Sequence, residues 1–226
     1  MLICHYLITL SKKEDMKVEI WSDVMCPFCY IGKRRFEKAM DSLGIGNDVE
    51  VIFRSFLLDP DLQTDPSKNV TEHLAHKKGV SMDEAQKMND YVSGMAAEEG
   101  LKYDLGNAVV ANSRNAHRLL HYAKSQGKQI EFKEALLKGY FEEGKNIDDL
   151  ETLKSLGQQV GLNAEDIEKT FSSADFTEEV IQDIQRAQQI GVQGVPFFVI
   201  NEKFALSGAQ PTDTFKQALQ KVQTEE

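Results

Sequence analysis

The stretch that decides the fold of this chain is residues 20–32, which read IWSDVMCPFCYIG. The apolar run that ends at Trp21 predicts a strand, and a helix is expected to begin at or just before Pro27. Proline suits the first helical position, because its missing N–H would have no partner within the helix. The helical pattern then continues until Gly44, which supplies a stop. Cys26 is therefore expected at a helix N-terminus.

The two cysteines of this stretch suit thiol–disulfide chemistry. Unpaired N–H groups and the helix dipole stabilise negative charge at a helix N-terminus, so the pKa of Cys26 is expected to fall below the ~8.5 of a free thiol. Cys29 lies one helical turn further along on the same side, so that the two sulfurs can close into a disulfide. We therefore predict that Cys26 is the nucleophile and that Cys29 is the more buried, resolving thiol.

A Cys-X-X-Cys pair also suits one half of a tetrahedral zinc site, which would need two more ligands. The histidine pairs His73 with His76 and His117 with His121 offer candidates. The separation between Cys29 and His117 is far longer than the spacing in compact zinc modules. The sequence therefore favours a redox pair and predicts no metal ion, with zinc as the alternative.

The composition is that of a globular chain with one large domain or two small ones: 226 residues, 41% of them hydrophobic and 27% charged. The net charge of −10 argues against nucleic acid and against an anionic membrane surface as partners. Three cysteines are too few for a disulfide framework and fit a reducing compartment. We therefore predict a cytoplasmic protein.

Residues 1–15 form an N-terminal extension. No basic residue precedes its apolar part and no small-residue cleavage site follows, so it does not match a signal peptide. It is also too short to span a bilayer. Because Met16 opens a run that leads directly into the first strand, Met16 is an alternative start, and Cys4 is expected to be incidental.

Strand-like patterns occur near both ends of the chain. Residues 49–53, VEVIF, alternate between apolar and polar side chains at their start and are rich in β-branched residues, which indicates a second strand. Residues 194–200, GVPFFVI, form an apolar run led by a proline. Asn201 and Glu202 then provide a hairpin turn before a partner strand at residues 203–206.

Between these strands a helical pattern extends over roughly a hundred residues. The polar stretch 61–69 has prolines near its two ends and suggests a domain junction. A last helix is expected from Pro211. We therefore expect residues 16–66 and 190–226 to form one α/β unit, with residues 67–189 inserted as a helical domain.

One helix of the inserted block has a strong start signal. Ser81 and Glu84 have the spacing of a capping box. The apolar residues that follow are expected to pack in a core rather than to bind copper. This expected stripe consists of Met82, Ala85, Met88, Tyr91, Val92 and Met95.

With CPFC at one end and Val195-Pro196 at the other, this order of elements resembles the thioredoxin superfamily, and more narrowly the DsbA-like group typified by the FrnE proteins. The resemblance extends from about Met16 to the C-terminus. It implies an α/β, thioredoxin-like fold with a large inserted α-helical domain. The family often has tryptophan where this chain has Phe28. The matching segments are SDVMCPFCYIG (22–32), FLLDP (56–60), NSRNAHRL (112–119), GVPFF (194–198) and SGAQP (207–211).

The resemblance also implies several site residues. A cis peptide bond is expected at Val195-Pro196, packed beside the Cys26 sulfur, and cis bonds are largely a proline phenomenon. A proline there removes one donor and leaves the Val195 backbone free to pair with an extended substrate. Met25 and Phe28 are expected to contact substrate. The helix that carries Asn112 and His117 is expected to face the active-site cleft. His117 is a candidate cleft residue, and the favoured alternative is a surface or core histidine.

Three further residues have two interpretations each. Asp23 is a candidate to relay a proton for Cys29, or it is a loop carboxylate that caps the helix. Arg114 and Arg118 are candidates to bind a glutathione carboxylate, or they belong to a solvated helix face.

The resemblance implies a dithiol–disulfide oxidoreductase or isomerase that acts on disulfide-bearing proteins or small thiol compounds. Glutathione or a thioredoxin-type protein is the expected reductant, and no cofactor is expected beyond glutathione as a candidate co-substrate. One alternative is a glutathione-dependent transferase or isomerase of the kappa or hydroxychromene-carboxylate isomerase type, which typically has serine in place of Cys26. A second alternative is a non-enzymatic peptide-binding or chaperone module.

Overall fold

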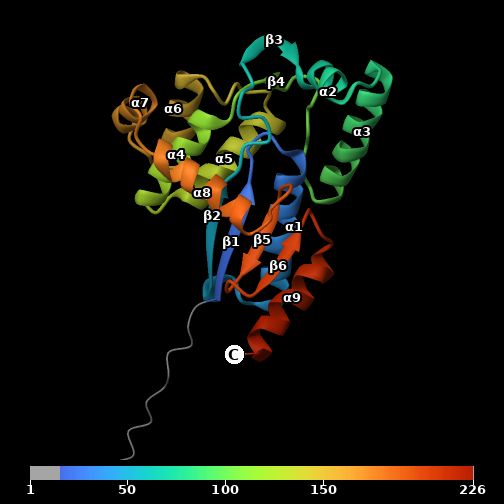
Figure 1. Ribbon diagram of the computed structural model, residues 1–226, viewed down its shortest axis with the longest axis vertical. Coiled ribbons are helices and arrows are strands. Elements are labelled where there is room, and N and C mark those ends of the chain that lie inside the picture. Colours follow the sequence, from blue (N-terminus) through green and yellow to red (C-terminus); the bar gives the residue numbers. More distant parts are fainter. Residues whose placement is uncertain (1–15, 226) are drawn as a thin grey trace, which may run out of the picture.

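The computed structural model describes residues 16–225, so the expectations about residues 1–15 lie outside the described residues. Figure 1 shows a central sheet with helices on both sides. The sheet has the strand order β2-β1-β5-β6. Strands β1 (Met16–Ser22) and β2 (Val49–Ser55) are parallel, and β5 (Phe197–Ile200) and β6 (Phe204–Ser207) form an antiparallel hairpin beside β1.

The turn between β5 and β6 has the predicted residues. Asn201 and Glu202 adopt positive φ angles of 47° and 58°. Two successive residues in the left-handed region give the turn the twist that adjacent antiparallel strands need. The predicted hairpin is therefore confirmed.

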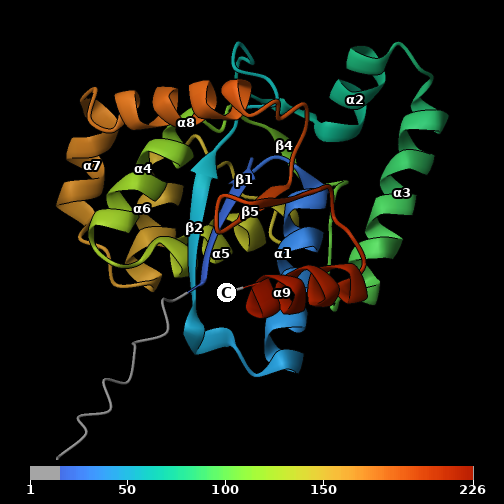
Figure 2. The same cartoon turned by 60° about the horizontal axis from the view of Figure 1, so that its bottom comes forward.

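Two helices cover one face of the sheet. Helix α1 (Pro27–Leu43) and helix α9 (Thr212–Glu225) lie side by side, and their aromatic residues Phe36 and Phe215 pack against Phe198 of β5. Figure 2 shows α9 alongside α1. Helix α8 (Thr177–Gln189) covers the opposite face, where Ala187 packs against the fully buried Trp21 of β1. The result is a three-layer α/β/α arrangement around β1.

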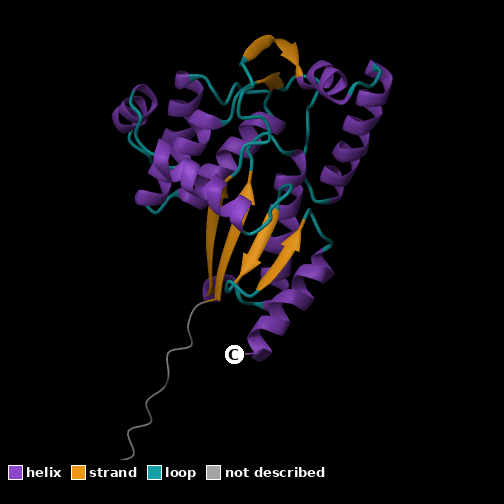
Figure 3. Cartoon of the chain, in the orientation of Figure 1, coloured by secondary structure: helices purple, strands orange, loops and turns teal. Residues whose placement is uncertain are grey.

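The inserted block lies between β2 and β5 in the sequence and is mostly helical, as Figure 3 shows. The α/β class with a helical insertion is therefore confirmed. None of the helices within residues 16–225 has both the length and the hydropathy needed to cross a membrane. The remaining helices of the block are α2 (Val70–Lys78), α3 (Met82–Glu98), α4 (Arg114–Ser125), α5 (Gln129–Phe141), α6 (Leu150–Gln159) and α7 (Ala164–Ser172).

The block also contains elements that the sequence patterns did not predict. The polar stretch 61–69 includes a strand, β3 (Asp65–Asn69), which pairs with the short strand β4 (Val109–Val110). Helix α2 follows immediately, because the Asn69 side chain caps it by accepting a hydrogen bond from the Glu72 N–H. Outside the block, a short 3-10 turn that was also not predicted, η1 (Gly46–Asp48), leads into β2.

Helix α3 confirms one prediction and corrects another. Its capping box between Ser81 and Glu84 is present. The predicted apolar stripe is half right: Ala85 and Val92 are buried and Met95 packs against the core, but the other three members are not buried. Three members of that stripe are exposed: Met82 by 50%, Met88 by 42% and Tyr91 by 69%. The buried positions follow a helical period through Ala85, Asn89, Val92 and Ala96.

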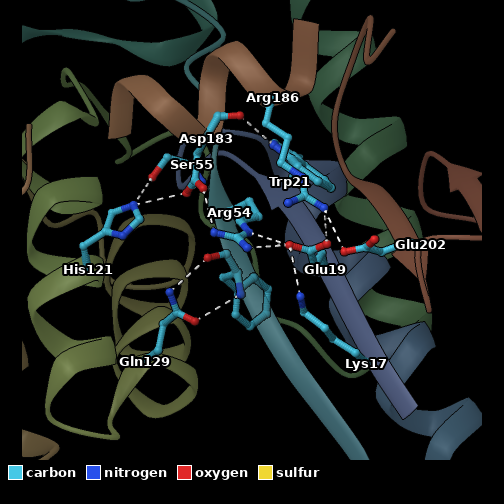
Figure 4. Close-up of polar contacts among 11 residues, drawn as sticks. Lys17, Glu19, Trp21, Arg54, Ser55, His121, Gln129, Asp183, Arg186 and Glu202 are labelled. Atoms are coloured by element: carbon cyan, nitrogen blue, oxygen red, sulfur yellow. Dashed lines mark hydrogen bonds and ion pairs between the residues drawn. The ribbon is translucent and has the colours of Figure 1, made fainter. Parts of the chain in front are cut away.

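Side chains from the insertion occupy the open edge of β2. The Gln129 side chain accepts a hydrogen bond from the Phe53 N–H at 3.1 Å and donates to the Phe53 carbonyl at 2.9 Å. Two residues further along β2, the Asp183 side chain accepts a hydrogen bond from the Ser55 N–H at 2.8 Å. Figure 4 shows both sets of contacts. They satisfy edge groups that would otherwise be available for pairing with another chain, and they attach the helical block to the sheet.

A buried charge cluster strengthens this attachment. Glu19 of β1 is only 1% exposed and is surrounded by three cations, Lys17, Arg54 and Arg186 (Figure 4). Arg54 also reaches Asp183 of α8 at 3.0 Å. Because a buried carboxylate is costly unless it is paired and hydrogen-bonded, these contacts fix α8 against the sheet.

Candidate active site

The N-terminus of α1 positions both cysteines. Cys26 is the residue that precedes the helix, with extended φ and ψ of −87° and 113°, and Pro27 occupies the first helical turn. The Cys29 N–H donates to the Cys26 carbonyl at 3.0 Å and closes that turn. Both thiols are free and nearly buried, with 4% of Cys26 and 2% of Cys29 exposed. The predicted helix start is confirmed, and Cys29 is the slightly deeper sulfur.

The segment before β5 lies against Cys26. The Val195-Pro196 peptide bond is cis, as expected. The Cys26 thiol donates to the Val195 carbonyl, with 3.4 Å between the sulfur and the oxygen. On the other side of the proline, the Gly208 N–H donates to the Pro196 carbonyl at 2.7 Å. Residues separated by about 170 positions in the chain therefore meet at the sulfur.

Gly32 makes this approach possible. It lies within α1, where glycine costs about 1 kcal/mol relative to alanine. A Cβ atom at this position would lie 2.8 Å from Cγ of Pro196 and 3.4 Å from Cα of Ala209. The absent side chain therefore leaves room for the proline ring. The sequence signal was present as a glycine inside a helical pattern, but its partner could not be identified from the sequence.

The cysteine pair has an uneven electrostatic environment. Its hydrogen bond with Cys29, together with burial, raises the pKa of Cys26. Burial also disfavours the Cys29 thiolate, but the hydrogen bond from Cys26 and the charge of Lys133 outweigh it and lower the pKa of Cys29. The prediction that the helix N-terminus lowers the pKa of Cys26 is therefore wrong for the reduced pair, in which the neighbouring Cys29 and burial raise it.

Asp23 organises the loop that leads into α1. It is fully buried, and its two oxygens accept hydrogen bonds from the Met25 N–H at 3.2 Å and the Leu58 N–H at 2.8 Å. His117 lies 3.4 Å from it. Burial raises the pKa of the Asp23 carboxyl, but these contacts lower it overall. The helix-capping interpretation is wrong, because no side chain caps the helix at Cys26 and Asp23 instead binds the preceding loop.

Several residues expected in the cleft have internal roles instead. His117 is 1% exposed, and burial lowers its pKa, so it is a neutral partner of Asp23 rather than a cleft residue. The Asn112 side chain donates to the Leu62 carbonyl and accepts from the Arg114 N–H, while its assignment to substrate binding stays a prediction. Arg118 is 5% exposed and is neither solvated nor available to a ligand. It donates to the backbone carbonyls of Thr170, Phe171, Ser173 and Asp175.

A cavity of about 460 Å³ opens beside the start of helix α1. Its walls include Met25 and Pro27, the two neighbours of Cys26 in the sequence. Phe28, 39% exposed, follows Pro27 in the first turn of α1. The rest of the wall is mainly apolar and comes from the helical insertion, with charged groups from α2 and from Asp59. These additional residues include Leu58, Leu74, Leu105, Phe141, Lys77 and Lys78.

Metal-binding groups and a possible hydrolase triad are two further kinds of site to consider. Within residues 16–225, no group of three or more histidine, cysteine or acidic side chains has metal-binding geometry. Ser55, His121 and Asp183 resemble a hydrolase triad in composition. However, Nε2 of His121 makes both contacts, at 3.1 Å to the serine and 3.2 Å to the aspartate. A general base needs one ring nitrogen for each partner, so this buried group is structural.

Comparison with known proteins agrees with this geometry. A probable DsbA oxidoreductase from Streptomyces coelicolor is similar in structure, with a TM-score of 0.88, 38% identity, and coverage of 93% of this chain and 91% of the other. YwbO of Bacillus subtilis, an uncharacterised protein, is 26% identical over 206 residues, which are 89% of this chain and 94% of YwbO.

A more distant similarity is to the cytosolic disulfide reductase DsbM from Pseudomonas aeruginosa, whose structure was determined with glutathione. The TM-score is 0.65 and the identity 16%, with 93% of this chain and 100% of the other covered, so that this likeness concerns the fold. The model of the DSBA-like thioredoxin domain matches residues 17–220. The chain therefore belongs to the DSBA-like thioredoxin domain family, a family of thiol–disulfide oxidoreductases.

Proposed function

We propose that this protein catalyses thiol–disulfide exchange on protein or small-molecule disulfides through Cys26 and Cys29, as an oxidoreductase or isomerase. The observation that carries the proposal is the position of Cys26. It precedes a helix, contacts the Val195 carbonyl at 3.4 Å and lies one helical turn before Cys29. Its sequence neighbours line a cavity large enough for part of a substrate.

In the first step Cys26 attacks a substrate disulfide. The thiol proton of Cys26 moves to the Cys29 thiolate, and the resulting Cys26 thiolate forms a bond to one substrate sulfur. The other substrate sulfur leaves with the electron pair and takes a proton from water. The charge that develops at Cys26 lies where the first N–H groups of α1 point, which favours the attack.

In the second step Cys29 attacks the Cys26 sulfur of the mixed disulfide. The Cys26–Cys29 bond forms, and the bond between Cys26 and substrate breaks. The released substrate thiolate receives the proton that Cys29 gives up. The cysteine pair is thereby oxidised by two electrons and the substrate disulfide is reduced to two thiols; the reverse sequence oxidises a dithiol.

The mainly apolar cavity favours substrates that have an apolar group next to the reacting sulfur. Exposed Phe28 and the Val195 backbone provide a second contact area for an extended chain. Lys77 and Lys78 at the cavity offer positive charge to a carboxylate, such as those of glutathione, which we propose as a candidate reductant beside thioredoxin-type proteins. A single reactive pair among three cysteines supports action in a reducing compartment such as the cytoplasm.

Cys29→Ser tests the proposal. With a disulfide-bonded substrate such as insulin, this variant should accumulate a covalent complex through Cys26 that is visible by mass spectrometry and is released by dithiothreitol. The matched control is Cys4→Ser, which should turn over substrate like the wild type. A Cys29→Ser enzyme that keeps full turnover without a covalent complex would instead indicate a glutathione-dependent transferase. Stoichiometric zinc in the purified protein, with no exchange activity, would favour the non-enzymatic alternative.

A further inference from the structure

Lys133 is a buried cation that the mechanism above does not use. It lies on α5 in the helical insertion, and none of its surface is exposed. Its ammonium group donates to the Ser22 carbonyl at 3.4 Å and lies 5.6 Å from the centre of the Phe53 ring. Among residues 16–225, no carboxylate forms a salt bridge with Lys133.

Such a position is costly for an amine. Burying an ammonium ion costs several kcal/mol unless a partner compensates it, and an apolar side chain of similar volume would fill the space without that cost. Burial lowers the pKa of Lys133 to about 8, although the negative charges of Cys29 and Asp23 oppose this shift. At neutral pH the side chain is therefore still mainly protonated, and the nearby negative charges of Cys29 and Asp23 favour that charged form.

The surroundings of Cys29 match this charge. Lys133 is one of the groups that lower the pKa of Cys29, and the Ser22 hydroxyl is another. That hydroxyl is buried, and apart from Cys29 it has no hydrogen-bond partner among the described residues, so it is available to a thiolate. Ser22 thus has its carbonyl towards Lys133 and its hydroxyl available to the sulfur.

We propose that Lys133 is a positioning residue for the exchange reaction, whose ammonium group holds negative charge on Cys29 and so promotes the displacement of substrate from Cys26. This role rests on the proposed function of the cysteine pair. In the reduced protein Cys29 also accepts the hydrogen bond from Cys26. In the mixed disulfide Cys26 has no proton to donate, so Lys133 and Ser22 remain to stabilise the attacking thiolate.

Other charged groups face the same space. Asp23, in the loop after β1, opposes the Cys26 thiolate and favours the charged form of Lys133. Lys33 on α1 disfavours that charged form, and His117 on α4 is a neutral neighbour. The effect of Lys133 on Cys29 should therefore be present at neutral pH and should be lost as pH rises above about 8.

The test compares Cys26→Ala with the double variant Cys26→Ala/Lys133→Met, in which Cys29 titrates alone. Thiolate absorbance at 240 nm, measured as a function of pH, reports the ionisation of Cys29. The half-ionisation pH should lie below that of a free thiol in Cys26→Ala. It should rise by about one unit or more without Lys133, which means roughly tenfold less thiolate at neutral pH. Lys133→Met in the otherwise wild-type protein should prolong the mixed disulfide in single-turnover exchange.

Lys33→Met is the matched control. Lys33 is also a nearly buried lysine, but its ammonium group pairs with Glu37 and Glu134 at 2.5 and 2.6 Å. Its removal should leave the Cys29 titration within a few tenths of a unit of Cys26→Ala. Equal titration curves with and without Lys133 would overturn the proposal. The proposal would also be overturned if Cys29 in Cys26→Ala were half-ionised at or above the pH of a free thiol. That measurement keeps Lys133 in place, so it does not depend on whether the Lys133 variants fold.

These measurements separate the two proposals. The titration of Cys29 needs no substrate, so it tests Lys133 even if the wild-type protein fails to reduce any disulfide. Absence of exchange activity together with a lysine-dependent titration would refute the proposed function alone. Normal exchange together with a lysine-independent titration would refute the role of Lys133 alone.

Discussion

Replacing Gly32 with alanine tests whether the packing of α1 against the Pro196 loop holds the site together. The new Cβ would lie 2.8 Å from Cγ of Pro196, whereas an ordinary contact needs about 3.4 Å. Because the proline ring is rigid, the loop must retreat by roughly half an ångström. The Val195 carbonyl, which contacts the Cys26 sulfur, must move with it.

The magnitude follows from two opposing terms. Alanine gains about 1 kcal/mol over glycine in a helix interior. Overpacking a tight contact costs about 1–3 kcal/mol. Gly32→Ala should therefore lower the free energy of unfolding by an amount between zero and about 2 kcal/mol. A loop displaced at the reacting sulfur should also lower kcat/KM for disulfide reduction by about tenfold.

Gly94→Ala is the control for the helix term. Gly94 lies inside α3, and a Cβ there would meet no atom within 4 Å. That variant should be stabilised by about 1 kcal/mol and should keep full activity. Urea unfolding gives the free energies, and insulin reduction gives kcat/KM. If Gly32→Ala proves as stable as Gly94→Ala and equally active, the close approach of Pro196 to α1 has no energetic importance, and the reasoning fails.

Three further variants test the surroundings of the site. The pKa of His117 is below its ordinary 6.5 in the folded protein, so that the unfolded chain takes up a proton at this imidazole at a higher pH than the folded protein does. The free energy of unfolding should therefore fall as pH drops below about 6.5, and His117→Gln should flatten that dependence in urea titrations. Arg54→Met should cost about 3 kcal/mol in urea unfolding, because it leaves buried Glu19 with less compensation, while exchange activity of the folded protein persists. Tyr103→Phe removes the hydroxyl that donates to the Pro27 carbonyl at 2.6 Å and should cost about 1 kcal/mol in thermal unfolding. An unchanged pH profile, a stable Arg54→Met protein or an unaffected Tyr103→Phe protein would contradict the respective argument.

The parts of the site that were predicted correctly are those with local causes. The Cys-Pro-X-Cys spacing and the proline at the first helical turn place Cys26 at the start of α1. The proline-led apolar run marks β5, and the resemblance to known proteins supplied the contact of Cys26 with Val195 and the cis bond before Pro196. None of these placements needed knowledge of the helical insertion.

The incorrect predictions have a common cause, which is the competition between partners that are distant in the sequence. Asp23 has the residue type and position of a helix cap, but the Leu58 N–H and His117 reach it and the cap is not made. Arg118 is one of several charged residues on its helix, yet it is buried among backbone carbonyls of the segment after α7. The buried face of α3 was predicted only in part: Ala85 and Val92 meet the core, whereas Tyr91 is exposed, because periodicity gives a direction on the helix but not the width of the face that is covered.

By itself, the sequence determined the helix start at the cysteines, because that depends on neighbours within one or two turns of chain. The order of the strand-like and helical patterns, together with the family resemblance, indicated the α/β class and the inserted helical block. Only the tertiary structure buries Lys133 beside Ser22, where its charge helps to lower the pKa of Cys29, although the two residues are about a hundred positions apart and no local pattern links them. It also gave a reason for the glycine at position 32, because the proline ring that needs the space comes from the other end of the chain. Electrostatic and steric effects act through space, and the fold alone sets those distances.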